Sequence, residues 1–246
     1  MIQTTAGLSA ALATLNFSIN LAAYLRARSS TRLSLPAGIF SRTRAASFRS
    51  SPAVLTAGPS SSSLLALGAL LSDFRKTLRL TGLIPLCIRL KSWTSNDASR
   101  GADPVLRRVV LLQCGAYIVF QAMENIYHLH VKGIFPSSIV DNTGGIAKWI
   151  AWSCRAWAIA IASDFLRLWR EVRIVKHESG TKTADEEENF KNRWWKEFMA
   201  SAFWLPVAVH SSFYPKGSRY MNAGTVALLS LLAASNNCRN QWQAAA

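Results

Sequence analysis

Acidic residues are scarce in this chain of 246 residues, and none occurs before Asp73. Asp and Glu together number 13, and all charged residues make up 17% of the chain, against roughly a quarter in an ordinary soluble domain. Half of the residues are hydrophobic, which is far from the composition of intrinsically disordered chains. The mean hydropathy of +0.15 is high for a water-soluble protein. We therefore expect neither a disordered chain nor a fully soluble globule.

Cysteine is also infrequent, and the four residues lie far apart, at Cys87, Cys114, Cys154 and Cys238. No C-x-x-C pair and no His at metal-ligand spacing accompanies them, so we interpret them as reduced packing residues. One glycosylation acceptor sequence, at residues 16–18, is a weak sign of secretion because such short matches arise often by chance. The sequence favours a reducing compartment.

Motifs of common enzyme chemistry are missing as well. The chain has no nucleophile elbow, P-loop, dinucleotide glycine pattern or H-E-x-x-H sequence. His128 and His130 are two residues apart, and on a helix such side chains point in nearly opposite directions. No third ligand follows at a useful spacing, so we expect no metal site. We expect no catalytic residue and no cofactor.

What the chain does contain is positive charge and aromatic residues. It has 28 Lys and Arg, a net charge of +15, nine Trp and 11 Phe, which fits a nucleic acid or an anionic membrane as partner. The hydropathy favours the membrane. We expect an all-α, membrane-associated helical bundle with amphipathic helices and a C-terminal hydrophobic helical hairpin, and no nucleic-acid partner.

Residues 1–63 divide into two parts. An apolar helix is expected over residues 8–25, followed by a basic linker rich in Ser and Arg over residues 29–63. The same absence of acidic residues is typical of a cleavable transit peptide, so this interpretation remains open. A secretory signal is disfavoured because the positive charge follows the apolar stretch.

Residues 64–93 are predicted to be the membrane-active part of the chain. Apolar side chains recur there at intervals of three and four residues and lie on one side of a helix, at Leu67, Leu70, Leu71, Phe74 and Leu78. We expect these five to insert into one leaflet. The opposite side carries three cations that we expect to contact anionic lipid headgroups, Arg75, Lys76 and Arg79. Gly82 and Pro85 are expected to break or kink this helix.

Residues 104–176 are expected to form a helical membrane-associated region. Pro104 suits the first position of a helix, but the uncharged segment 109–123 is shorter than the ~20 residues that cross a membrane. Near its end, Phe165, Leu168, Trp169 and Val172 are predicted to face away from Arg167 and Arg170. We therefore expect this run to lie in or near the membrane interface.

Residues 177–193 are predicted to be a polar loop in water, because they contain the acidic run 185–188. Two uncharged stretches follow, residues 198–215 and 220–238, separated by a short polar turn. We expect residues 194–246 to form a transmembrane hairpin and a short tail. Small residues four apart, such as Ser230 and Ala234, would let two helices approach closely.

Three segments taken in order resemble the peroxin-11 family of peroxisomal membrane proteins, and most closely its divergent C-type branch. They are LSDFRKTLRLTGLIPL at residues 71–86, QAMENIYHL at 121–129 and SDFLRLW at 163–169. The resemblance extends over most of the chain from residue 64 onward, the C-terminal hairpin included. It implies a non-enzymatic protein of the peroxisomal membrane that bends and elongates this membrane during proliferation and division.

The resemblance also implies homo-oligomers, other peroxin-11 members, and the organelle fission machinery as partners, namely a dynamin-like GTPase and its adaptor. Two alternatives stay open at this point. The first is a mitochondrial inner-membrane protein with a cleaved N-terminal segment. The second is a membrane-embedded enzyme that uses His128 or His130.

Overall fold

The computed structural model describes residues 5–33, 63–95, 103–177 and 183–243, and all regular structure in these ranges is helical. This confirms the all-α prediction. The elements are α1 (Thr5–Leu33), α2 (Ser63–Leu78), the 3₁₀ helix η1 (Arg79–Gly82), α3 (Leu83–Thr94), α4 (Pro104–Val131), α5 (Ser137–Asn142), α6 (Gly145–His177), α7 (Ala184–Ser211) and α8 (Ala223–Gln243).

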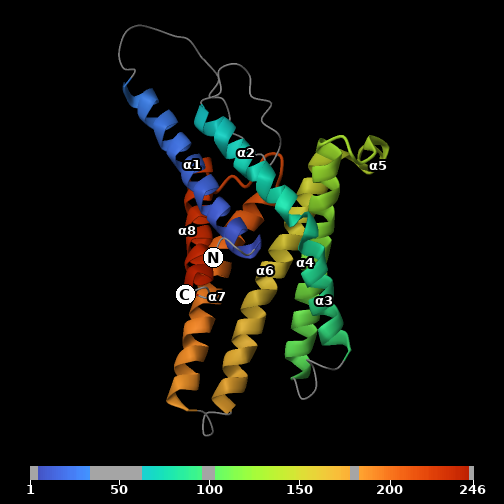
Figure 1. Cartoon of the computed structure of the whole chain (residues 1–246), viewed down its shortest axis with the longest axis vertical. Helices are drawn as coiled ribbons and strands as arrows, with labels where there is room; N and C mark the ends of the chain where they lie inside the picture. Colours follow the sequence, from blue (N-terminus) through green and yellow to red (C-terminus); the bar gives the residue numbers. More distant parts are fainter. Residues whose placement is uncertain (1–4, 34–62, 96–102, 178–182, 244–246) are drawn as a thin grey trace.

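The two longest neighbours, α4 and α6, run antiparallel and share the most extensive contact in the molecule (Figure 1). Fully buried Val110, Ile150 and Leu168 lie between them and their neighbours. The ring of Phe120 stacks on that of Trp157 with centroids 5.7 Å apart, and the Ser153 hydroxyl donates to the Phe120 carbonyl. This pair is the framework on which the other helices pack.

The remaining long helices extend this framework. Helix α7 returns antiparallel along α6, and α8 packs on both α7 and α1 (Figure 1). The contact between α1 and α8 is built from small residues, including Ala13, Ala227 and Ala234, all of which are buried. A Cβ placed on Gly224 of α8 would lie 2.2 Å from Cε1 of Tyr24 on α1. Small residues therefore allow these two helices to approach closely.

Helix α2 crosses α1, and after η1 the chain continues as α3 along the outside of α4 (Figure 1). The predicted break at Gly82 and Pro85 is a mild one. Pro85 occupies the third position of α3, where its missing N–H breaks no intrahelical hydrogen bond. The joint bends the chain without unwinding it, so α2 and α3 present one continuous outer side.

The polar loop predicted over residues 177–193 is wrong in its second half, because α7 begins at Ala184. Thr183 caps this helix: its hydroxyl accepts from the Glu186 amide, and the Glu186 carboxylate accepts from the Thr183 amide. The acidic run 185–188 lies in the first turn, where carboxylates are stabilised by the helix dipole. The T-x-x-E spacing was a readable signal for this helix.

The C-terminal helical hairpin is present, but its helices are α7 and α8, connected by residues 212–222 rather than by a four-residue turn. Among the described residues, two other segments are long and apolar enough to cross a membrane, Gly7–Arg28 and Pro104–Val131. By length and composition these two are candidate spans, and the placement of the spanning helices in the hairpin stays a prediction. Segment 109–123 lies within a helix of 28 residues, so its flanks supply the missing length.

Two further predictions concern the N-terminal segment and the start of α4. The expected apolar helix near residues 8–25 is the central part of α1, and residues 34–62 of the predicted linker lie outside the described residues. Pro104 is the first residue of α4, as predicted, and the Asp103 carboxylate accepts from the amides of Val105 and Leu106.

Candidate membrane-active site

The inner side of α2 and η1 is bound to α4 by polar contacts. The Arg79 Nη2 lies 2.7 Å from Glu124 Oε1, and Asp73 forms an ion pair with Lys132. Thr77 Oγ1 lies 3.2 Å from His128 Nε2. These partners come from two of the sequence segments that resemble peroxin-11, at residues 71–86 and 121–129. The structure therefore brings together two motifs that are about 40 residues apart in the chain.

The backbone of η1 is held as well. The side-chain amide of Gln121 donates to the Arg79 carbonyl, and that of Asn125 donates to the Leu80 carbonyl, each at 3.1 Å. A 3₁₀ turn leaves carbonyls without helical partners, and these two amides satisfy them. The position of the joint between α2 and α3 is thus fixed by α4.

Helix α1 covers the other part of the inner side of α2. The Arg75 guanidinium lies over the ring of Phe17, with Cζ 5.1 Å from the centroid. Burial, together with the neighbouring charge of Arg79, lowers the pKa of Arg75 to about 10. Gly68 is buried where α2 crosses α1, and a Cβ there would lie 2.9 Å from Oδ1 of Asn20. Burial also lowers the pKa of Lys76.

The outer side of α2 is apolar. Leu70 has 66% of its surface exposed and Phe74 48%, and Leu67 is exposed beside them. Leu71 and Leu78 are half-buried at the edges of this surface. We call Leu67, Leu70 and Phe74 the outer apolar face of α2.

Sequence reasoning missed the continuation of this face onto α3. Ile84 and Ile88 are among the most exposed apolar residues of the described chain. They follow Phe74 by ten and fourteen residues, close to three and four helical turns, which keeps nearly one side of a helix. This spacing can be read from the sequence, but the break expected at Gly82 led us to end the predicted apolar side at Leu78.

Two of the three cations expected at lipid headgroups also contact other helices. Arg79 is paired with Glu124, and Arg75 lies on Phe17, so both face other helices. Lys76 lies between them along α2 and is half-buried. The physical reason is the presence of Glu124, a buried carboxylate on α4 that requires a cation.

A second polar cluster joins α4, α6 and α7. Arg167 Nη2 lies 3.1 Å from Asp164 and 2.5 Å from Glu197, while its Nη1 lies 2.7 Å from Glu171. The Asp164 carboxylate also accepts from the Gln113 amide and the Ser201 hydroxyl. Three carboxylates surround the half-buried Arg167 guanidinium. Asp164, Arg167 and Glu171 of α6 are thus paired inside the bundle.

This cluster corrects the expected orientation of residues 165–176. Phe165 packs edge-on against Phe198, and Leu168 is buried, so these two face inward as does Arg167. Trp169, predicted to lie on the same side as Leu168, is exposed. The inward side of α6 contains both apolar and charged residues, because α7 supplies Arg193 and Glu197 as partners for the charged ones.

The site offers an apolar surface and shielded charges, and no reactive group in the described residues is arranged as a catalytic centre. His128 contacts Thr77 and lies 3.9 Å from Asp73, which are contacts between helices. In the described ranges no three His, Cys, Asp or Glu residues are placed to hold a metal ion. All four cysteines are free, and of these Cys87 is exposed, so it is not a packing residue as expected.

Long helices with exposed apolar residues on their outer sides and ion pairs inside define a helical membrane protein. The family model of peroxisomal biogenesis factor 11 (PEX11) matches residues 57–211, more than half of the chain, and the chain therefore belongs to this family. Proteins of this family reside in the peroxisomal membrane, are not enzymes, and act in peroxisome proliferation and membrane elongation. The comparison with curated proteins gives no match, and neither does the comparison with solved structures.

Membership decides between the alternatives that the sequence left open. The location is the peroxisomal membrane and not the mitochondrial inner membrane. The alternative of a membrane-embedded enzyme is excluded because proteins of this family are not enzymes. The match begins shortly before α2 and ends with α7, so it contains both polar clusters and the outer apolar face.

Proposed function

We propose that the chain elongates the peroxisomal membrane by pressing the outer apolar face of α2 into one leaflet. The residues that insert are those predicted from the sequence, Leu67, Leu70, Leu71, Phe74 and Leu78. The observation that carries this proposal is the exposure of Leu70 and Phe74 while the cations of the same helix are turned toward α1 and α4. An apolar face without charges can enter the acyl region of one leaflet, and wedging one leaflet bends the membrane.

Residues 64–93 act as one membrane-active unit in this proposal. Ile84 and Ile88 add to the inserted area because they lie on the same side of the continuous α2–α3 segment. Each apolar side chain that leaves water contributes about 1.5 to 3 kcal/mol, so insertion of Phe74 alone outweighs a cation near an anionic surface, worth about 1 kcal/mol.

Anionic headgroups are the proposed partners of Arg75, Lys76 and Arg79. Arg79 keeps 32% of its side chain exposed while it is paired with Glu124, and a guanidinium has five N–H donors. It can therefore hold Glu124 and a phosphate at the same time. We expect these contacts to adjust the depth of the helix and the apolar residues to supply most of the binding energy.

The test uses the full chain reconstituted into giant vesicles that contain phosphatidylserine. The wild type is expected to draw tubules from them, and Phe74→Glu is expected to lose most of this activity. Ser138→Glu adds the same charge on α5, at an exposed residue of an element that packs on α4 and α6, and should tubulate like the wild type. Equal tubulation by wild type and Phe74→Glu would contradict the proposal.

In cells that lack the protein, the same variants test its role in proliferation. Phe74→Glu should leave peroxisomes fewer and larger, whereas Ser138→Glu should restore their number. Arg75→Gln should have a smaller effect than Phe74→Glu, since it removes one charge and leaves the apolar face intact.

The proposal has two further parts. In the first, the chain associates with itself and with other peroxin-11 members and recruits a dynamin-like GTPase and its adaptor. In the second, the chain belongs to the C-type branch of the family. Support comes from family membership and from the order of the three sequence motifs. Cross-linking in isolated peroxisomes followed by mass spectrometry tests the partners. Recovery of the chain as an uncross-linked monomer would contradict this part of the proposal.

A further inference from the structure

Helix α6 has an outer stripe that is uniform along most of its length. The exposed positions from residue 152 to residue 169 recur every three or four residues: Trp152, Arg155, Ile159, Ala162, Leu166 and Trp169. Its four large apolar members are exposed to nearly the same extent, between 51% and 54%. We call these six residues the α6 stripe. Such an even apolar surface is unusual for a helix that contacts water.

Each end of the α6 stripe is marked by a cation stacked on a tryptophan. The Arg155 guanidinium lies over the Trp152 ring at 4.9 Å, and that of Arg173 lies over the Trp169 ring at 4.6 Å. The 17 steps from Trp152 to Trp169 correspond to about 25 Å along a helix. A bilayer has a hydrocarbon core of about 30 Å and collects Trp and Arg at both of its boundaries.

The charges that α6 carries between these ends point away from the stripe and are paired. Asp164, Arg167 and Glu171 form the internal cluster, with side chains between 12% and 14% exposed. Arg170 forms two hydrogen bonds, at 3.0 and 2.7 Å, to the carboxylate of Asp103. By composition alone, α6 has too many charged residues for a spanning helix. Its outer surface, in contrast, is mostly apolar, as that of a spanning helix is.

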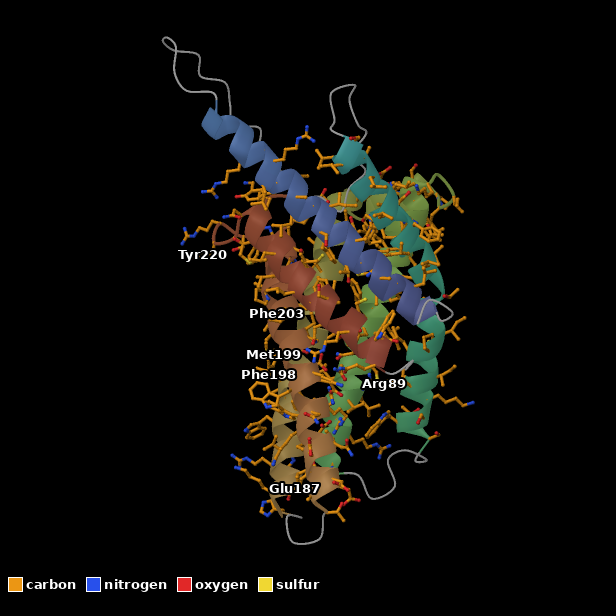
Figure 2. The ribbon with its side chains drawn as sticks, turned by 60° about the vertical axis from the view of Figure 1, so that its left-hand side comes forward. Arg89, Glu187, Phe198, Met199, Phe203 and Tyr220 are labelled. Atoms are coloured by element: carbon orange, nitrogen blue, oxygen red, sulfur yellow. The ribbon has the colours of Figure 1, made fainter. Side chains whose placement is uncertain are left out.

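Helix α7 repeats the arrangement beside α6 in the same register. The Trp194 indole N–H donates to the Leu168 carbonyl, and the Trp204 and Trp157 rings lie 5.4 Å apart, so these residues share two levels of the bundle. Trp195 and Met199 are exposed on α7 near the lower level. Figure 2 shows Phe198, Met199 and Phe203 along one edge, with Glu187 toward one end and Tyr220 toward the other. Here too an apolar zone lies between polar ends.

We propose that α6 crosses the bilayer with the α6 stripe in contact with lipid acyl chains, next to α4 and α7. The ligand is the hydrocarbon of the membrane, and the Arg155 and Arg173 guanidiniums lie at its two polar boundaries. This inference rests on the peroxisomal-membrane location and does not depend on α2. A surface with Arg and Trp at both ends and about 25 Å of apolar side chains between them matches a bilayer in length and in charge.

A nitroxide scan of the full chain in phosphatidylcholine vesicles tests the proposal. Spin labels are placed at Ala162→Cys, Lys148→Cys or Lys176→Cys after the native cysteines are replaced by Ala or Ser. At position 162 the label should be several-fold more accessible to oxygen, which dissolves in lipid, than to a water-soluble nickel complex. At positions 148 and 176 the order should reverse.

Two results of the scan would overturn the proposal. Greater access of the nickel complex at position 162 would mean that the stripe lies in water. Low access of both reagents would mean that a second copy of the chain covers it. Either result leaves the tubulation test of Phe74 untouched, so failure of this inference and failure of the proposed function can be told apart.

A second measurement needs no substitution. The wild-type chain in vesicles that contain a diazirine on the lipid tail is irradiated, and the labelled residues are mapped by mass spectrometry. Label is expected on Ile159, Ala162 and Leu166 and not on Ala160 and Ile161, which are buried neighbours of similar chemistry. An α6 without label, in a sample where α2 is labelled, would overturn the proposal.

Discussion

The guanidinium of Arg79 lies 2.7 Å from the carboxylate of Glu124, and this ion pair connects η1 to the C-terminal third of α4. Only 7% of the Glu124 side chain is exposed, and the Tyr127 hydroxyl donates to the same oxygen at 3.3 Å. A carboxylate so buried requires a cation, which explains why the basic side of α2 is directed inward and its apolar side outward. One internal pair thus sets the orientation of the membrane-active helix.

Glu124→Gln and Arg79→Gln are each expected to lower the free energy of unfolding by about 1 to 3 kcal/mol, because each leaves a charged group in the site without its partner. Thermal unfolding in detergent micelles, followed by circular dichroism, measures this. The double variant should lose less than the sum of the two single losses. Lys191→Gln, at an exposed pair with Glu187, is the control and should change the value by less than about 0.5 kcal/mol. Additive losses would show that the pair does not couple the two helices.

Gly224→Ala is expected to destabilise the packing of α8 on α1, since the added Cβ would lie 2.2 Å from the ring of Tyr24. The expected loss is about 1 to 3 kcal/mol, as for other insertions into a packed contact. Gly115→Ala is the matched control in α4, because nothing lies within 4 Å of its Cβ. That control should be neutral or stabilise the protein by up to about 1 kcal/mol through helix propensity. Equal unfolding temperatures for the two variants would contradict the close approach of α1 and α8.

The ion pair of Asp103 and Arg170 predicts a loss of stability in acid. The hydrogen bond from Arg170, followed by that from the Leu106 amide, lowers the pKa of Asp103 to about 2. Since this value lies below the ~3.9 of an unfolded chain, the pair stabilises the fold above about pH 4, and the contribution is lost as the pH falls toward 2.

The variant Asp103→Asn isolates this contribution, because Asn caps a helix about as well as Asp but carries no charge. Its unfolding temperature should change less than that of the wild type between pH 5 and pH 2. Parallel curves for the two proteins would show that Asp103 is not the group that titrates.

The candidate span in α4 predicts which arginine releases the protein from the membrane. Val119→Arg, in the middle of α4, should cost roughly 2.5 to 3.5 kcal/mol on insertion scales and increase the fraction extracted by alkaline carbonate. Leu228→Arg on α8 is the matched control, since Leu228 is exposed to 46% and Val119 to 49%. It should leave extraction unchanged. The opposite order would restore the C-terminal hairpin as the anchor.

The helical class and the outer apolar face could be predicted from the sequence because both depend on local periodicity. The spacing of Leu67, Leu70 and Phe74 defines one side of a helix whatever packs on the other side. Asp103 and Pro104 likewise mark the start of α4 through the geometry of a single turn. The resemblance to peroxin-11 was equally a property of the linear sequence, and the family match over residues 57–211 confirms it.

The pairing of side chains between helices could not be predicted from local periodicity. An amphipathic pattern states which residues share a side, but the neighbours decide whether that side faces lipid, water or protein. Arg79 was expected at lipid headgroups and Arg167 near the membrane interface, but the fold brings Glu124 and Glu197, 45 and 30 residues away, within 2.7 and 2.5 Å of them. Charge on a helix therefore did not mean contact with water.

The sequence by itself determined that this chain is helical, apolar and basic, and that α2 has one apolar side. Only the tertiary structure decided that Arg79 of η1 and Arg167 of α6 form ion pairs inside the bundle, while Phe74 and Trp169 are exposed. The physical reason is that an ion pair away from water forms only where the fold supplies the opposite charge at hydrogen-bond distance, and this is a long-range property of the chain.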